Sequence, residues 1–410
     1  MICGNIVIGQ SGGPTAAINA SLCGIIEGAL ESGFCGEIYG MVNGIEGLIK
    51  EKLKDLKSEF AEKEKRDALC HTPSAYLGSC RYKMPSSKDK PEVYEKIFDV
   101  LKKYSIKYFV YIVGNDSMDT AYNLSEYSKE HGCGVSVIGV PKSIDNDLGG
   151  TDHCPGYGSA AKFVASSIRE MHCDTNVYDM KSVLIVEIMG RDAGWLTASS
   201  VLARGEKCES PDLIYLPEVP FDTERFLCDV KNITDRKNTA IVAVSEGIRD
   251  KNGVYICESM SSGAVDCFGH KYLSGAGKVL ENAVRERLKI KARAVELNVL
   301  QRCAGHIQSA CDISEARENG RCAFRAVYSG VTGKMMGYVR QTDENGNYSV
   351  ISEAMDIESV ANKEKKIPRE WINEEGNFVK DEFIKYVLPL VKGESYPEYK
   401  DGIPVYLSLA

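Results

Sequence analysis

Short apolar runs alternate with longer helical patterns along most of the chain. The runs are rich in β-branched and aromatic residues, as expected for strands that are buried on both faces. In the helical patterns polar and apolar positions recur with a period near 3.6, so one face of each helix is apolar. Strands that alternate with helices predict an α/β fold of doubly wound, mainly parallel sheets. The clearest runs cover residues 5–8, 108–113, 135–140, 183–188 and 240–244, and the clearest helical pattern covers 118–130.

The length of the chain predicts two lobes. A single hydrophobic core usually stops growing at about 250–300 residues, and this chain has 410. We place the first lobe at 1–150, the second at 151–337 and a C-terminal extension at 338–410, and the chain can cross between the lobes more than once. The extension is polar, and residues 343–347 predict a hairpin turn. The densely charged stretch 50–66 predicts a solvent-exposed helix.

Composition restricts the partners and the location. Apolar residues make up 43% and charged residues 26%, which is ordinary for a soluble globular protein. A net charge of −8 opposes a nucleic-acid or anionic-membrane partner, so any phosphate site has to be local. No apolar window reaches a transmembrane length, and a strand begins too early for a signal peptide. The 15 scattered cysteines favour free thiols in a reducing compartment, so we expect a cytoplasmic protein.

The first strand runs into a glycine-rich turn at residues 9–15. Gly12 and Gly13 would let an anion approach the backbone, and Pro14 suits the first turn of a helix whose amide groups face that anion. A tight turn without a ligand explains this segment equally well. The later Gly277-Lys278 pair lacks the glycine spacing of a Walker nucleotide loop.

Further polar residues follow the next strands. Asn115 and Asp116 end one strand, where they would also serve as a helix cap. Another strand ends in the run 141–147, where Lys142 precedes two carboxylates separated by one residue, Asp145 and Asp147. This arrangement suits metal binding combined with proton abstraction, and phosphoryl transfer needs both.

A fourth strand ends in Met189-Gly190-Arg191, which adds a guanidinium for phosphate charge. One such strand end is unremarkable. Ligands bind beyond the carboxyl ends of parallel strands, so successive ends of this kind indicate one shared anionic ligand.

The sequence resembles the phosphofructokinases from residue 3 to about residue 337, because several of their motifs occur here in family order. The resemblance implies a two-lobed α/β fold with a phosphoryl-donor and catalytic lobe followed by a sugar-phosphate lobe. It implies phosphoryl transfer to the 1-hydroxyl of fructose 6-phosphate with Mg²⁺, in a homo-oligomer that is a dimer or a tetramer. The motifs are Ser11-Gly12-Gly13, Leu77-Gly78-Ser79-Cys80-Arg81, the run 141–147, Met189-Gly190-Arg191, Pro217-Glu218 and the segment from Arg293 through Arg302.

The resemblance also implies roles for single residues. Asp145 would be the base that takes the 1-hydroxyl proton, with Asp147 assisting it and helping to position the metal. Other residues would bind the transferring phosphoryl group, namely Ser143, Arg191, Arg81 and the backbone of Gly12. The sugar would be held by Met189, Gly190 and Glu218, and its 6-phosphate by Arg293 and Arg302.

Asp116 and Lys142 speak to the phosphoryl donor. Family members that use ATP carry glycine at both places, so this pair resembles the pyrophosphate-dependent branch, in which the reaction is reversible. A carboxylate where an α-phosphate would pass repels ATP, by roughly 4 kcal/mol at about 4 Å and an effective dielectric near 20. Lys142 would act on pyrophosphate as a catalytic cation. With Asp116, Asn115 would bind the metal, although an amide is a weaker ligand than the carboxylate many members carry there.

Two positions depart from the family, and three alternatives stay open. Val299 stands where members present histidine or tyrosine to the sugar phosphate, and Ser182 stands where many members contribute an arginine to a neighbouring subunit. One alternative is an ATP-dependent phosphofructokinase, and another is a non-catalytic regulatory subunit that binds phosphorylated metabolites. A dinucleotide-dependent oxidoreductase ranks last, because the first turn lacks the three-glycine fingerprint. Sedoheptulose 7-phosphate remains open as a second acceptor.

Overall fold

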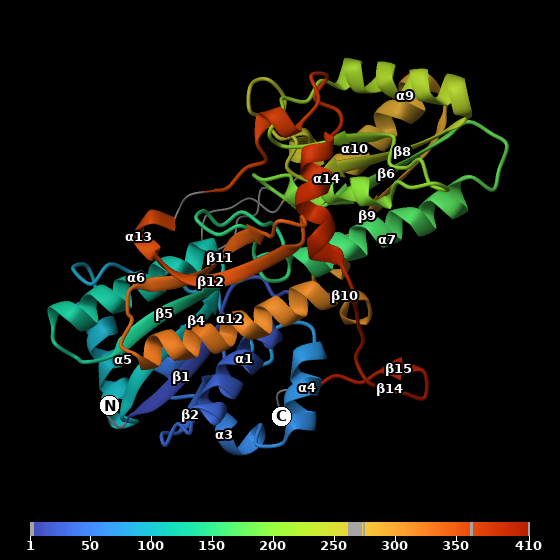
Figure 1. Cartoon of the computed structure of the whole chain (residues 1–410). Helices are drawn as coiled ribbons and strands as arrows, with labels where there is room; N and C mark the ends of the chain where they lie inside the picture. The colour runs from blue at the N-terminus through green and yellow to red at the C-terminus, as the bar shows by residue number, and fades with distance from the viewer. Residues whose placement is uncertain (1–3, 261–272, 274, 361–363, 409–410) are drawn as a thin grey trace.

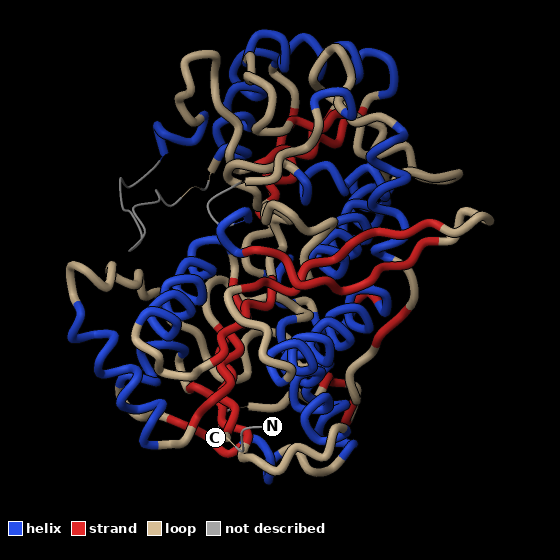
Figure 2. Tube along the Cα trace, turned by 60° about the vertical axis from the view of Figure 1, so that its left-hand side comes forward, coloured by secondary structure: helices blue, strands red, loops and turns tan. Residues whose placement is uncertain are grey.

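The computed structural model describes residues 4–260, 273, 275–360 and 364–408. Two sheets form the cores of two lobes, the first below and the second above in Figure 1, and both sheets are layered between helices (Figures 1 and 2). This confirms the predicted two-lobed α/β fold. Among the described residues no helix combines the length and the apolar character that crossing a membrane requires.

The sheet of the first lobe has seven strands in the order β12-β11-β5-β4-β1-β2-β3. The pairs from β11 to β2 are parallel, and only the two outermost strands, β12 and β3, run antiparallel to their neighbours. The strands are β1 (Asn5–Gln10), β2 (Ile38–Met41), β3 (Leu53–Asp55), β4 (Ile106–Val113), β5 (Ser136–Pro141), β11 (Lys334–Thr342) and β12 (Tyr348–Asp356).

The sheet of the second lobe has four strands, all parallel, in the order β7-β8-β6-β9. Its strands are β6 (Ser182–Ile188), β7 (Leu213–Tyr215), β8 (Thr239–Ser245) and β9 (Lys291–Glu296). Two short pairs lie outside the sheets, β10 (Gln308–Ser309) with β13 (Glu394–Ser395) and β14 (Tyr399–Lys400) with β15 (Ile403–Pro404).

Helices cover both faces of each sheet, which explains the continuously apolar strands. In the first lobe Ile6 and Ile8 pack towards one helical layer and Val7 towards the other, since successive side chains of a strand point to opposite faces. The helices of this lobe are α1 (Ile18–Glu31), α2 (Gly44–Ile49), α3 (Leu56–Glu59), α4 (Lys63–His71), α5 (Pro91–Lys103), α6 (Asn115–Glu130), α12 (Ala310–Tyr328) and α13 (Ile357–Val360). Those of the second lobe are α7 (Tyr157–Thr175), α8 (Trp195–Ala198), α9 (Thr223–Lys237), α10 (Ala276–Ala283), α11 (Leu300–Cys303) and α14 (Asp381–Val387).

Sheet membership does not follow the boundaries expected at 150 and 337. After α11 the chain returns to the first lobe, where α12 packs on α1 and β11 pairs with β5 (Figure 1). The two helices approach so closely that a Cβ atom at Gly24 would lie 1.8 Å from Arg317 O. Later, α14 joins the second lobe's core through Phe383 and Val387. The segment after 337 is therefore the edge of one sheet followed by part of the other lobe's core.

Local predictions fared differently. The turn at 343–347 is present between β11 and β12, where Asp343 accepts from the N–H groups of Asn345 and Asn347. The single helix expected over 50–66 was wrong. That stretch contains β3, α3 and the start of α4, because Leu56 and Phe60 are fully buried and pull the chain onto the first core.

Candidate active site

Three neighbouring strands of the first sheet, β1, β4 and β5, end side by side, because parallel pairing carries their carboxyl ends to one edge. The turn after β1 is tied to β4 by the Ser11 N–H, which donates to Ile112 O at 3.1 Å. The turn after β5 is tied to β4 by the Lys142 N–H, which donates to Val113 O at 3.0 Å. These turns form one wall of a cavity of about 280 Å³.

The second lobe supplies the opposite wall, so the cavity lies between the lobes. The first lobe and the run after β5 contribute Gly12, Gly13, Pro14, Arg81, Gly114, Asn115, Ser117, Lys142, Ser143, Ile144, Asp145 and Asp147. The second lobe and the C-terminal segment contribute Met189, Arg191, Asp192, Ala193, Glu246, Arg302 and Glu364. Most of the residues singled out from the sequence therefore share one cavity.

Lys142 is buried between two glycine turns. Its side chain is 4% exposed, and a Cβ atom would lie 2.9 Å from its Nζ at Gly12 and 3.0 Å away at Gly114. Gly12 also has a φ of +82°, which side chains rarely adopt. Both glycines therefore leave room for an ammonium group at the floor of the cavity.

Internal hydrogen bonds hold the run after β5. The Ser143 hydroxyl donates to Asp147 Oδ1 at 2.7 Å and accepts from the Asp145 N–H at 3.1 Å. Asn146 between the two aspartates is fully buried. The two carboxylates therefore sit on a fixed turn at the cavity.

The surroundings of Asp145 favour its neutral form. Burial, followed by the charge of Asp147, raises the pKa of Asp145 to about 7, against the opposing influence of Lys142, Arg191 and Arg302. A carboxylate whose pKa lies near the working pH is suited to accept and return a proton.

Glu246 is a cavity residue that the sequence prediction missed. Its Oε1 accepts from the Gly190 N–H at 3.4 Å, and burial, followed by the charge of Asp145, raises the pKa of Glu246 to about 8. Near neutral pH it carries a proton and can both donate and accept hydrogen bonds. Glu246 directly follows β8, so the rule that ligands bind beyond strand ends would have found it.

Glu218, predicted to hold the sugar, does not line the cavity. Its carboxylate accepts from the Gly194 N–H at 2.8 Å and the Ile367 N–H at 3.1 Å. These bonds turn it away from the cavity, and it ties the turn that follows Arg191 to the C-terminal segment.

A second cavity of about 330 Å³ adjoins the first, and Val299 is among its lining residues. Arg302 lies at the boundary, with its Nη1 3.5 Å from the position of a Cβ atom at Gly13 in the other lobe. Arg302 therefore spans the gap between the lobes. The lining residues shared by both cavities are Arg81, Met189, Arg191, Glu246 and Arg302.

The remaining predicted residues are Arg293, Gly190 and Asp116. Arg293 lines a separate cavity beside Lys291 and Tyr178, so within one chain it does not join Arg302. It lies early in β9, about 10 Å of strand before the end that leads to α11. Gly190 contributes backbone with a φ of +138°, while its neighbours Met189 and Arg191 line the cavity. The side chain of Asp116 lies outside the described residues.

The oxygen-bearing residues fit a loosely held magnesium ion. Asn115, Asp145 and Asp147 all line the cavity. In the described part of the chain, no three His, Cys, Asp or Glu residues are grouped so that they could hold a metal. Mg²⁺ usually binds one or two carboxylates and takes its remaining ligands from substrate phosphates and water. The Asp147 carboxylate and the Asn115 amide are such a set.

Comparisons with known proteins identify relatives over most of the chain. The phosphofructokinase family model matches residues 5–327. The chain is 38% identical over 408 residues to a pyrophosphate–fructose 6-phosphate 1-phosphotransferase of Methylococcus capsulatus, covering 99% of this chain and 96% of the relative. The chain is 29% identical to an ATP-dependent 6-phosphofructokinase 2 of Streptomyces coelicolor. That match covers 81% of this chain and 90% of the relative.

A solved structure shows the same fold over nearly the whole chain. The pyrophosphate-dependent phosphofructokinase of Nitrosospira multiformis superposes with a TM-score of 0.88 at 36% identity. The match covers 99% of this chain and 96% of that one, including the C-terminal segment. With a family model that spans both lobes and relatives that match from end to end, the chain belongs to the phosphofructokinase family.

Proposed function

We propose that this chain transfers a phosphoryl group reversibly from pyrophosphate to the 1-hydroxyl of fructose 6-phosphate, giving fructose 1,6-bisphosphate and phosphate. One observation carries the proposal. The buried Lys142 and Asp145, whose pKa lies near neutrality, follow the same strand and line the same cavity. The full-length relative from Methylococcus capsulatus is named for this reaction. The reaction can serve glycolysis or gluconeogenesis.

Asp145 takes the proton of the 1-hydroxyl as that oxygen attacks phosphorus, and it returns the proton in the reverse direction. Arg191 faces the same cavity and neutralises charge on the transferring group, with Arg81 and Ser143 beside it. The ammonium of Lys142 pairs with the phosphate that leaves. Asp145, Ser143 and Lys142 lie on the turn after β5 and Arg191 follows β6, whereas Arg81 lies in the segment between α4 and α5.

Mg²⁺ is the proposed metal, and Asn115 and Asp147 would hold it together with Asp116. When bound, it would neutralise pyrophosphate charge and orient its oxygens. Asp147 already accepts a hydrogen bond from Ser143, so its carboxylate is oriented.

The adjoining cavity is the proposed sugar-phosphate site. Arg302 supplies charge for the 6-phosphate, Met189 lies against the sugar, and protonated Glu246 can exchange hydrogen bonds with its hydroxyls. Val299 offers no hydrogen bond there. Arg293 belongs to this site only if a second copy of the chain brings it, which suits the proposed homo-oligomer, a dimer or a tetramer. We place the enzyme in the cytoplasm, without nucleic-acid or membrane partners.

The rival donor is ATP, and initial rates with each donor decide between the two. With fructose 6-phosphate and Mg²⁺ present, we expect pyrophosphate to support a kcat/KM at least about a hundredfold above that for ATP, which is less than one unfavourable charge contact can supply. An equal or higher value for ATP would refute the proposed donor.

A matched variant tests the role of Lys142. Lys142→Met keeps the length of the side chain and removes its charge, so kcat/KM for pyrophosphate should fall about 30-fold or more. The exposed Lys103→Met serves as the control. A non-catalytic regulatory subunit would show no turnover with either donor.

A further inference from the structure

Asn146 lies between the two aspartates of the catalytic run and has an unusual backbone conformation. Its φ is +57°, in the left-handed region that asparagine tolerates better than most residues. Its side chain is fully buried, so its amide has to find partners inside the protein. The conformation of this one residue sets the directions in which Asp145 and Asp147 leave the backbone.

The orientation of the Asn146 amide follows from its partners. The Cys154 N–H lies 3.0 Å from Oδ1, and a backbone N–H can only donate, so the oxygen faces that side. The amide nitrogen then donates to the Tyr386 hydroxyl at 2.8 Å. Tyr386 in turn donates its own proton to Asp152 O at 2.7 Å. The Tyr386 hydroxyl therefore accepts from Asn146 and donates to Asp152 O, so it links the two sites.

Tyr386 reaches this position from α14, 240 residues further along the chain. The Arg340 guanidinium donates to Tyr386 O at 3.0 Å and lies over its ring, 4.6 Å from the centroid. The Trp195 ring packs against it at 5.2 Å between centroids. The phenol is therefore held on several sides and cannot follow Asn146 if the catalytic run moves.

The same C-terminal segment holds the far end of the run. The Lys365 N–H donates to Asp147 O at 2.7 Å. The backbones of Glu364 and Leu148 form an antiparallel β-bridge. The Lys365 ammonium donates to the Thr151 carbonyl at 3.3 Å. Residues 145–148 are thus held by backbone bonds on one side and by the tyrosine hydroxyl on the other.

We propose that Tyr386 is a positioning residue for phosphoryl transfer, acting through Asn146 on the two aspartates. It touches neither cavity, so it contributes geometry and no charge. The inference rests on the proposed function, in which Asp145 is the base. It also gives the C-terminal segment a role in catalysis, since only the folded segment brings the hydroxyl to the run.

Tyr386→Phe is the direct test, with Tyr157→Phe as the matched control. Tyr157 is fully buried in the second lobe's core, and its hydroxyl donates to Trp195 O at 3.1 Å rather than to Asn146. We expect Tyr386→Phe to lower kcat about 10- to 100-fold, as small misplacements of reacting groups do. The KM values for both substrates should stay within about twofold, because uniform binding is untouched.

Two readouts separate positioning from loss of stability. Both variants lose one buried hydroxyl and should melt at similarly lowered temperatures, yet only Tyr386→Phe should lose turnover. The loss should be the same factor in the forward and reverse directions, because the enzyme cannot change the equilibrium constant and the KM values do not move.

A double-mutant cycle tests the route through Asn146. Asn146→Gly keeps access to the left-handed conformation but removes the amide, so it should also lower kcat. Adding Tyr386→Phe to it should cause no further loss, since the contact is already gone. Fully additive losses, or equal turnover losses in Tyr386→Phe and Tyr157→Phe, would overturn the proposal. Failure of the base assignment would appear separately, as near-normal turnover of Asp145→Asn.

Discussion

Two groups of ionisable residues each include a residue of the segment 142–156, here called the crossing segment. The pKa values of their carboxyl groups are shifted in opposite directions. At the cavity, the pKa values of Asp145 and Glu246 are raised to about 7 and about 8. A few residues further on, Asp152 and His153 meet Glu315 and Arg340. We call these four residues the joint cluster. There the pKa of Asp152 is lowered to about 2, although burial opposes this, by hydrogen bonds from His153 and Arg340.

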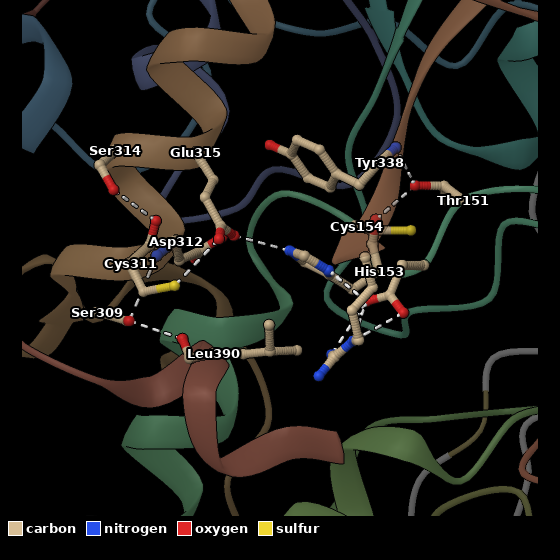
Figure 3. Close-up of polar contacts among 12 residues, drawn as sticks. Thr151, His153, Cys154, Ser309, Cys311, Asp312, Ser314, Glu315, Tyr338 and Leu390 are labelled. Atoms are coloured by element: carbon tan, nitrogen blue, oxygen red, sulfur yellow. Dashed lines mark hydrogen bonds and ion pairs between the residues drawn. The ribbon is translucent and has the colours of Figure 1, made fainter. Parts of the chain in front are cut away.

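The partners explain the difference. His153 lies between two carboxylates, 2.9 Å from Asp152 and 2.9 Å from Glu315, and Figure 3 shows the contact with Glu315. Arg340 donates to Asp152 at 3.0 Å. At the cavity, the strongest influences on the carboxylates are burial and another carboxylate. Charges of the joint cluster therefore stabilise the fold, whereas those of the cavity reduce its stability and are available for chemistry.

Asp145→Asn should have the largest effect and sharpens this comparison most. We expect kcat to fall about 10²- to 10⁴-fold, the usual contribution of a general base, with substrate binding largely kept. Steady-state kinetics and equilibrium binding of fructose 6-phosphate measure the two effects. Near-normal turnover would remove Asp145 from the base role.

The same variant should not lose stability. Because the folded-state pKa of Asp145 is raised above the ordinary 3.8, ionisation weakens the fold as pH rises through about 7. At pH 8 and without ligands, Asp145→Asn should melt at an equal or higher temperature than the wild type. The exposed Asp89→Asn is the control for the loss of one charge.

Arg340→Met should produce the reverse pattern. It leaves Asp152 partly buried without its guanidinium partner, and we expect a loss of about 3 kcal/mol in the free energy of unfolding. Urea denaturation measures this, with Arg325→Met on the exposed side of α12 as the control. Turnover well below the melting temperature should fall no further than in Tyr386→Phe; a larger loss would place Arg340 in the chemistry.

His153→Gln should have a smaller effect that depends on pH. Hydrogen bonds to the two carboxylates raise the pKa of His153 above 6.5 despite burial. The stabilisation is therefore complete below pH 6.5 and is lost as pH rises through the folded-state value. At pH 6 the free energy of unfolding of the wild type should exceed that of the variant by about 1.5–3 kcal/mol. This difference should become smaller by pH 9. A difference that is constant with pH would contradict the charged state; the exposed His131→Gln serves as the control.

Glu246→Gln should show the smallest change. At pH 7 the wild-type side chain is mostly protonated, so an amide of the same shape should keep kcat/KM within about fivefold. Above pH 8 the wild-type carboxyl ionises next to the proposed sugar-phosphate site, whereas the amide cannot. Profiles of kcat/KM between pH 6.5 and 9 should therefore be flatter for the variant, and a steep loss at pH 7 would show that the charged form is needed.

Strands of both sheets and many of the cavity residues could be predicted from local patterns. The strands at 108–113 and 183–188 were predicted from their continuously apolar runs. The runs are apolar because helices cover both faces of each strand. Lys142 and Asp145 line the cavity at the end of β5, and Arg191 lines it from the end of β6 in the facing lobe. The prediction of one helix over 50–66 was wrong, because two buried apolar residues outweighed the charge pattern of that stretch.

The sequence by itself determined the family, the α/β fold and many of the residues that line the cavity, since strand periodicity and strand-end residues are local features. Only the tertiary structure decided which glutamate enters the cavity, with Glu246 inside and Glu218 bonded to backbone N–H groups outside it. It also decided that Tyr386 meets Asn146. Such contacts depend on how α14 packs against the crossing segment, and no local pattern encodes a partner 240 residues away.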